Sequence, residues 1–180
     1  MSEIEYKGQR VCVFIDIQNL YHSAKNLYGG RVNYKVLMES VLGDRRLVRA
    51  LAYVVRSDPA TGEDTFFEAL EKDGIELRVK DIQVFSSGAK KADWDVGMAV
   101  DAIRMADLAD VIVLVTGDGD FVPLVEYLKW GFGRSVEVAA FGRTASARLE
   151  EEADRFYDLE EVDGLVFRSS RSRKAVRAQA

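Results

Sequence analysis

Two short apolar runs, each followed within three residues by aspartate, constrain the fold of this chain more than any other feature. Residues 11–15 read VCVFI and precede Asp16, and residues 111–115 read VIVLV and precede the segment TGDGD. Five-residue runs without a polar side chain are typical of parallel strands that are covered on both faces. We therefore expect two central strands with acidic residues at their carboxyl ends.

The rest of the chain alternates between strand and helix patterns. Further strands are expected at 47–55, 75–80, 82–85 and 135–141, with an edge element within 156–166. Helices are expected from about residue 19 and at 34–42, 63–72, 93–107, 121–130 and 145–152, with polar loops at 56–62 and 86–91. This order predicts an α/β fold: a three-layer, Rossmann-like parallel sheet between two layers of helices. Ligands of such sheets bind beyond the carboxyl ends of the strands, where the strand order reverses.

Acidic residues gather at this expected binding edge. Asp16, Asp118 and Asp120 follow the two buried strands, and Asp95 lies at the start of the helix before the second strand. If the two strands are neighbours, these carboxylates converge. Carboxylates held together are unfavourable without a compensating cation, so we expect them to bind Mg²⁺ or Mn²⁺, which prefer oxygen ligands. Such ions orient a phosphodiester, generate hydroxide and stabilise the leaving oxygen.

Helix capping is the competing interpretation of each acid taken alone. An aspartate after a strand often caps the next helix, and acids in a first turn interact favourably with the helix dipole. Asp101 has no such role, because it lies inside an otherwise apolar helical stretch. It is six residues from Asp95 and therefore on another helix face. Asp101 either supports the site or pairs with Arg104 at i+3.

Four further residues are candidates for substrate contact. Asn19, three residues after Asp16, is placed to hold a water or a phosphate oxygen, and the Thr116 hydroxyl is expected to face the site. Lys90 and Lys91 lie on a predicted polar loop beside the acids and are expected to contact phosphates. The alternative to substrate contact is helix or turn capping for Asn19 and Thr116, and a solvated loop for Lys90 and Lys91.

Composition excludes several other classes of protein. With one cysteine, Cys12, and one histidine, His22, the chain has no internal disulfide, no cysteine zinc cluster and no HExxH protease motif. A serine or cysteine nucleophile has no plausible base. No GxxxxGK[ST] motif is present, and no GxGxxG follows the first strand. No apolar stretch approaches the roughly 20 residues of a membrane helix, and the polar N-terminus is no secretory signal, so we expect a cytoplasmic protein without membrane contact.

Charge divides the chain into two parts. Of its 180 residues, the first 167 hold all 30 acidic residues and 20 of the 25 basic ones, whereas residues 168–180 are basic. We expect one domain over residues 1–167 and a basic, disordered tail over 168–180. The acidic body argues against a broad nucleic-acid-binding face.

Three segments of the sequence together resemble a known family. They are FIDIQNL (14–20), DWDVGMAVDAIRMADLADVIVLVTGDGDF (93–121) and GRSVEVAAFG (133–142). They resemble the NYN domain family, specifically its bacterial LabA-like branch, over about residues 9–160. The family often carries lysine three residues before the helix aspartate, whereas this chain has Ala92 there.

The resemblance implies a PIN-like fold related to FLAP nucleases and a metal-dependent ribonuclease activity. It implies that the site residues are Asp16 and Asn19 of the opening D-x-x-N, the helix acids Asp95 and Asp101, and Asp118 and Asp120 of the final D-x-D. We therefore expect an endoribonuclease that acts on single-stranded RNA with Mg²⁺ or Mn²⁺.

The sequence leaves alternatives to this activity open. One is a non-catalytic regulatory module that binds RNA or protein, and another is a phosphodiesterase or phosphatase acting on small nucleotides. The sequence also leaves open whether the chain forms a homo-oligomer.

Overall fold

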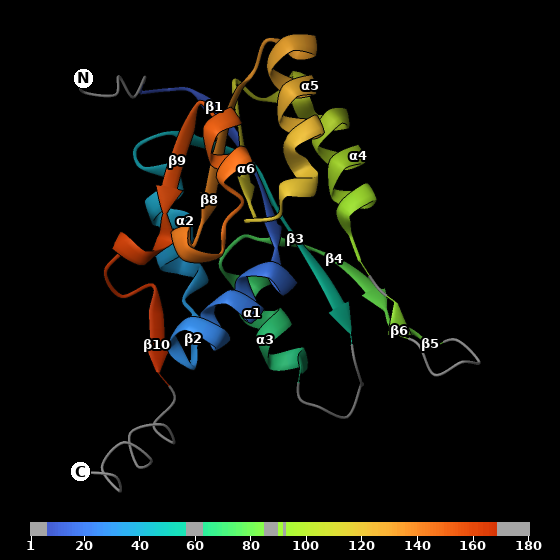
Figure 1. Ribbon diagram of the computed structural model, residues 1–180, viewed down its shortest axis with the longest axis vertical. Coiled ribbons are helices and arrows are strands. Elements are labelled where there is room, and N and C mark those ends of the chain that lie inside the picture. Colours follow the sequence, from blue (N-terminus) through green and yellow to red (C-terminus); the bar gives the residue numbers. More distant parts are fainter. Residues whose placement is uncertain (1–6, 57–62, 85–89, 92, 169–180) are drawn as a thin grey trace, which may run out of the picture.

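A six-stranded parallel sheet forms the centre of the computed structural model, which describes residues 7–56, 63–84, 90–91 and 93–168 (Figure 1). The strand order is β4-β3-β1-β7-β8-β9, and every neighbouring pair runs parallel. The strands are β1 (Arg10–Asp16), β3 (Arg46–Arg56), β4 (Glu76–Asp81), β7 (Val111–Val115), β8 (Ser135–Ala140) and β9 (Arg155–Asp158). The predicted edge element at 156–166 corresponds in part to β9.

Helices cover both faces of the sheet. Alternate side chains of β1 separate the core into two clusters: Val11, Val13 and Ile15 pack on one face, and Cys12 and Phe14 on the other. The first face is covered by α1 (Ile17–Tyr28), α2 (Tyr34–Leu42) and α3 (Glu63–Lys72). The second is covered by α4 (Asp95–Met105), α5 (Val122–Phe132) and α6 (Ala147–Glu152). The predicted three-layer α/β fold is confirmed.

Two small antiparallel ladders lie outside the main sheet. Strand β2 (Gly30–Val32) pairs with β10 (Val166–Arg168), and β5 (Gln83–Val84) pairs with β6 (Lys90–Lys91). The predicted loop at 86–91 was wrong at Lys90 and Lys91, because pairing with β5 rather than residue type decides their backbone conformation. Strand β10 ends at Arg168, one residue into the expected tail, and residues 169–180 lie outside the described part of the chain.

Capping residues explain where the helices begin and end. Helix α1 begins at Ile17 instead of residue 19 because the Asp16 carboxylate accepts the backbone N–H of Asn19. Helices α2 and α3 have the predicted bounds. Helix α5 continues through Gly131 and ends at Gly133, whose φ of 63° is readily adopted by glycine. Helix α4 is shorter than predicted, since a 3₁₀ turn over Ala106–Leu108 follows it.

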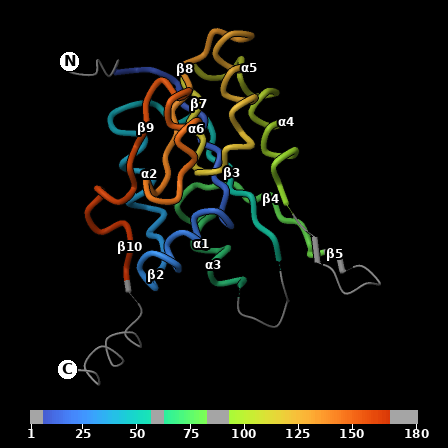
Figure 2. The backbone as a smooth tube through the Cα atoms, in the orientation of Figure 1, coloured from blue at the N-terminus to red at the C-terminus, as the bar shows by residue number. Residues whose placement is uncertain are grey.

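The strand order reverses between β1 and β7. From β1 the chain builds the sheet outward through β3 and β4, and from β7 it builds in the other direction through β8 and β9. The two strands pair in parallel from Val11 with Val111 to Ile15 with Val115. Figure 2 shows the course of the chain through the sheet. Their carboxyl ends, with the acids that follow them, therefore lie side by side at the switch point. Among the helices described, none is long and apolar enough to cross a membrane.

Candidate active site

Asp16 ends β1 and uses both of its carboxylate oxygens in hydrogen bonds. Its Oδ1 accepts the Asn19 backbone N–H at 3.1 Å, and its Oδ2 accepts the Thr116 hydroxyl at 3.2 Å. The first bond is the helix cap, and the second reaches across to the neighbouring strand. Asp16 therefore caps α1 and also lies beside the loop that follows β7, so the capping role does not remove it from the candidate site.

The loop after β7 is tied to the first turn of α1. Thr116 is fully buried, and its Oγ1 accepts the Asp118 backbone N–H at 3.2 Å while its proton goes to Asp16. The side-chain carbonyl of Asn19 accepts the Gly117 backbone N–H at 2.9 Å. These bonds fix the direction of the loop that carries Asp118.

Asp118 and Asp120 begin a short turn ahead of α5. The Asp118 Oδ1 accepts the Asp120 backbone N–H at 2.9 Å and caps the 3₁₀ turn Gly119–Phe121. Helix α5 itself has Phe121 as its N-cap, with no side-chain capping bond. Asp118 is half-buried and Asp120 is exposed. Asp118 therefore caps the 3₁₀ turn, and neither acid caps α5 itself.

Electrostatic coupling brings Asp95 into the same group. Burial raises the pKa of the Asp95 carboxyl, and the negative charges of Asp16 and Asp118 raise it further. Asp93 and Asp120 act on it in the same direction. Burial also raises the pKa of Asp16 and outweighs the lowering effect of its hydrogen bonds with Asn19 and Thr116, while the negative charge of Asp118 adds a smaller contribution in the raising direction. We call Asp16, Asp95, Asp118 and Asp120 the acidic cluster.

The acidic cluster has a donor set suited to a hard divalent cation. Its members offer carboxylate oxygen only, and within the described ranges no Lys, Arg or His forms an ion pair with any of them. In the same ranges, no three acidic, His or Cys side chains approach closely enough to enclose an ion by themselves. The cluster thus has uncompensated charge and the right ligand chemistry, without a closed ligand cage.

Asp101 lies in a different network. Its carboxylate accepts the Tyr53 hydroxyl at 3.1 Å and pairs with Arg78 at 3.3 Å and with Arg104 at 3.7 Å. The predicted i+3 pair with Arg104 is present. These contacts join α4 to β3 and β4, and the structure does not bring Asp101 together with the acidic cluster.

A lysine that the sequence interpretation did not consider lies beside the start of α4. The Lys80 ammonium donates to the Asp93 backbone carbonyl at 2.8 Å and lies 4.6 Å from the Trp94 ring centroid. Only the position of β4 next to α4 reveals this proximity. The side chains of Lys90 and Lys91 lie outside what the structure describes, as does Ala92.

The loop after β8 covers the loop that carries the acids. The Ser146 backbone N–H donates to the Gly117 carbonyl at 2.9 Å. A Cβ atom on Gly117 would lie 3.1 Å from the Ala145 Cα, and one on Gly119 would lie 2.8 Å from the Ser146 Oγ. A side chain at Gly117 would therefore press on the backbone of the covering loop, whereas at Gly119 it would meet the end of the Ser146 side chain. Ser146 also escaped the sequence interpretation, since nothing in the sequence shows that these loops meet.

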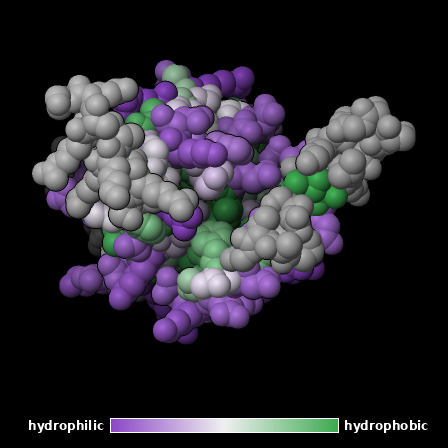
Figure 3. All heavy atoms as spheres, turned by 90° about the horizontal axis from the view of Figure 1, so that it is seen from below, coloured by the Kyte–Doolittle hydropathy of each residue, from purple (hydrophilic) through white to green (hydrophobic). Residues whose placement is uncertain are grey.

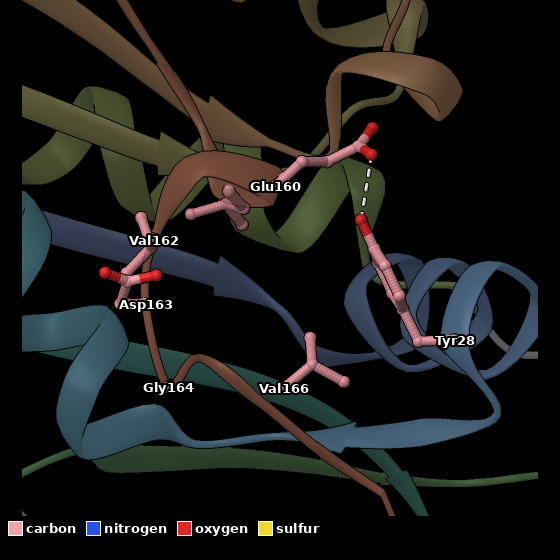
Figure 4. A pocket seen from close by; sticks show the side chains of 7 residues that line it. Tyr28, Glu160, Val162, Asp163, Gly164 and Val166 are labelled. Carbon is pink, nitrogen blue, oxygen red and sulfur yellow. Dashed lines mark hydrogen bonds between the residues drawn. The ribbon is translucent and has the colours of Figure 1, made fainter.

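A separate hollow of about 250 Å³ lies beside α1 and β10 (Figure 4). The Tyr28 hydroxyl donates to Glu160 there at 2.8 Å, and the Arg143 guanidinium binds the same carboxylate at 2.7 Å. Glu160 is thus engaged by two partners, and none of the residues that line this hollow belongs to the acidic cluster.

Comparison with known proteins identifies the family. The family model described as "NYN domain" matches residues 10–160, which is most of the chain. The chain belongs to the NYN domain family. As a member of this PIN-like, nuclease-type family, it carries its acidic cluster at the carboxyl edge of the sheet.

Two individual proteins are similar to this chain over most of its length. This NYN protein is 26% identical to the low amplitude and bright protein LabA of Synechococcus elongatus, over 96% of each chain. It is 28% identical to VPA0982 of Vibrio parahaemolyticus, a protein of unknown function, with a TM-score of 0.82 over 92% of this chain and 100% of that one. The second likeness extends to the three-dimensional arrangement of almost the whole domain.

Proposed function

We propose that this NYN protein is a metal-dependent ribonuclease that hydrolyses RNA phosphodiester bonds. The observation that carries the proposal is that Asp16 and Asp118 follow the paired strands β1 and β7 and are both hydrogen-bonded to Thr116, with Asp95 near enough for their charges to raise its pKa. A carboxylate group of this density is unfavourable unless cations bind to it. Family membership supports the same chemistry.

The residues divide into three roles. Asp16, Asp95, Asp118 and Asp120 would hold one or two Mg²⁺ or Mn²⁺ ions, with water completing the coordination, since Mg²⁺ usually retains several waters. A bound cation would lower the pKa of water and stabilise the leaving oxygen. Asn19 and Thr116 position Asp16 and the 117–118 loop through the hydrogen bonds described above, and the Asn19 amide is a candidate contact for water or phosphate.

Asp101 has a supporting role in this proposal. Its ion pair with Arg78 holds strand β4 against α4, the helix that begins with Asp95, whereas its pair with Arg104 lies within α4. The link is structural, since Asp101 contacts Tyr53 and arginines and not the acidic cluster. It replaces the direct catalytic role that the family motif implied.

RNA is the substrate that these features favour, and a single strand fits an edge with few cations better than a duplex does. Lys80 supplies one positive charge at the start of α4. Lys90 and Lys91 are proposed to add phosphate contacts. Cleavage assisted by metal-bound water is expected to leave a 5′-phosphate on the product.

The test is cleavage of labelled single-stranded RNA with Mn²⁺ by the natural protein and by Asp118→Asn. Asparagine keeps the oxygen that caps the 3₁₀ turn but removes the charge. Loss of a metal contact worth several kcal/mol predicts a fall in rate of about 100-fold or more. Asp107→Asn, at an exposed position outside the cluster, is the matched control and should cleave normally.

Other outcomes identify other functions. Cleavage of RNA at the same rate by both proteins would reject the cluster as the active site. Hydrolysis of small nucleotides but not RNA would indicate a small-nucleotide phosphodiesterase or phosphatase. Metal-independent RNA binding without cleavage would indicate a regulatory module.

A further inference from the structure

An apolar groove of about 470 Å³ runs between α4 and α5 and opens at the acidic cluster. Helices α4 and α5 lie next to each other on one side of the sheet (Figure 1). Asp95 and Asp120 form part of the groove wall at its acidic end. The other lining residues are Val96, Ala99, Ile103, Phe121, Pro123, Leu124 and Tyr127. Its volume lies in the range of about 300–1,000 Å³ that suits small organic groups.

The groove exposes more apolar surface than a solvated helix pair requires. Val96 is 74% exposed and Tyr127 is 51% exposed, whereas Phe121 beneath them is buried. On the face drawn in Figure 3, the described surface of the molecule is mainly polar, with apolar side chains in only a few places. Contiguous exposed apolar surface next to an active site indicates that a ligand covers it.

Charge decides what kind of ligand fits. No lysine or arginine is among the lining residues, and two carboxylates stand at one end. A phosphate group inside the groove would meet no cationic side chain, whereas at the acidic cluster a bound divalent cation would offset the carboxylates. A second copy of this chain, which carries a net charge of -5, would bring a further set of carboxylates toward Asp95 and Asp120. A neutral, flat, aromatic group avoids both penalties.

We propose that this groove binds one nucleobase of the RNA substrate, next to the phosphate held at the acidic cluster. The inference rests on the proposed ribonuclease function and adds a substrate subsite to it. The base would stack on the exposed Tyr127 ring, and Val96 would contact it from the opposite helix. Because single-stranded bases are free to splay out, such contacts need no particular base sequence.

The test compares aromatic residues on one helix. Binding of a short single-stranded RNA is measured by fluorescence anisotropy in the non-cleaving Asp118→Asn protein, with Mn²⁺ present. Loss of one base–aromatic stack predicts that Tyr127→Ala raises Kd by about tenfold, within a range of about 5- to 100-fold. Trp130→Ala, which removes an aromatic ring that is 81% exposed on α5 but does not line the groove, should leave Kd within about twofold.

Abasic RNA separates a base contact from a general effect on folding. Replacing one nucleotide at a time by an abasic unit should identify a position that weakens binding to the parent and to Trp130→Ala. The same replacement should cost nothing further with Tyr127→Ala. Additive losses would overturn the proposal, because they would show that Tyr127 and this base do not interact.

A second pair of variants covers the case in which loss of the Tyr127–Phe132 ring contact disturbs α5. Val96→Glu adds a charge to the groove at an exposed position of α4, whereas Val100→Glu adds it to the same helix outside the groove lining. Only Val96→Glu should weaken RNA binding. Equal effects of both substitutions would indicate general charge repulsion and overturn the proposal.

The remaining outcomes identify which inference has failed. Sedimentation of the same variants tests self-association: a dimer that Tyr127→Ala and Val96→Glu dissociate, with RNA affinity unchanged, would show that a second copy covers the groove. If the natural protein cleaves RNA but none of the groove variants alters binding, the base subsite alone is rejected. If the natural protein neither binds nor cleaves RNA, the proposed function fails, and the subsite with it.

Discussion

The Asn19 side-chain carbonyl accepts the backbone N–H of Gly117 at 2.9 Å. This bond joins the first turn of α1, which follows β1, to the loop that follows β7. It spans the point where the strand order of the sheet reverses. The position of Asp118 relative to Asp16 therefore depends on Asn19 as well as on the pairing of the two strands.

Removing this acceptor should reduce activity more than stability. Asn19→Ala leaves the Gly117 N–H without its partner, which costs about 1–3 kcal/mol when the group is buried. Because residues 117–118 carry the Asp118 carboxylate, a small displacement of this loop should lower the RNA cleavage rate by about 10- to 100-fold. Asn26→Ala, at an exposed position of the same helix, is the control. Equal rates for the Asn19 and Asn26 variants would show that the bond does not position the site.

Divalent cations should stabilise the folded protein. A ligand present at 100 times its Kd adds about 2.7 kcal/mol to the free energy of unfolding, which corresponds to an increase in Tm of about 5–11 °C for a domain of this size. Calorimetry with Mn²⁺ and with Mg²⁺ measures the shift. Asp118→Asn should lose most of it, because one ligand charge is gone. A shift of equal size in both proteins would place the bound cation elsewhere.

Asp95 should make the metal-free protein less stable as the pH rises. Its pKa in the folded state is raised above the ordinary value of 3.8 by burial and by the neighbouring carboxylates. Between 3.8 and the raised value, the folded state binds more protons than the unfolded state, so stability falls with increasing pH in this window. Asp95→Asn should therefore match the natural protein below this window in chelator and be more stable above it.

Asp110 provides the opposite case in the same experiment. Hydrogen bonds from Arg10 lower the pKa of Asp110 to about 2. The ionised Asp110 carboxylate stabilises the folded state above pH 3.8, and this stabilisation is lost as the pH falls toward 2. Asp110→Asn should therefore be less stable than the natural protein at neutral pH. Denaturant titrations from about pH 2.5 to pH 7 compare the three proteins, so that they include the range in which each carboxyl group titrates. Differences of the same sign for Asp95→Asn and Asp110→Asn at pH 7 would contradict the assignment.

A methyl group at Gly117 should disturb the site through the covering loop. Gly117→Ala places its Cβ 3.1 Å from the Ala145 Cα and 3.4 Å from the Thr144 carbonyl oxygen, so backbone must move. Such overpacking typically costs about 1–3 kcal/mol, and the cleavage rate should fall with it. Gly131→Ala lies inside α5, where the methyl meets the Tyr127 ring at 3.4 Å or more and alanine favours the helix by about 1 kcal/mol. Denaturation and cleavage assays on both variants separate a local steric effect from a general effect of glycine replacement.

Much of the architecture could be predicted because local patterns specify it. The all-apolar runs of β1 and β7 indicate strands covered on both faces, and the alternation with helices indicates a parallel sheet. Asp16, Asp95, Asp118 and Asp120 could be placed at one edge for the same reason, since parallel strands end on the same side. The small antiparallel ladders could not be predicted in this way. Lys90 and Lys91 form β6 only because β5 is available to pair with them.

The sequence by itself determined the order and the approximate positions of the main strands and helices, since hydrophobic periodicity and capping act over a few neighbouring positions. The tertiary structure decided which of the acids belong together. Asp95 and Asp101 lie on one helix, yet Asp95 interacts electrostatically with Asp16 while Asp101 pairs with Arg78 of β4. The contacts of Lys80 with Asp93 and of Ser146 with Gly117 were likewise decided by the fold. Each joins segments whose proximity follows from the order of strands in the sheet, and strand order is set by packing across the whole core rather than by any local pattern.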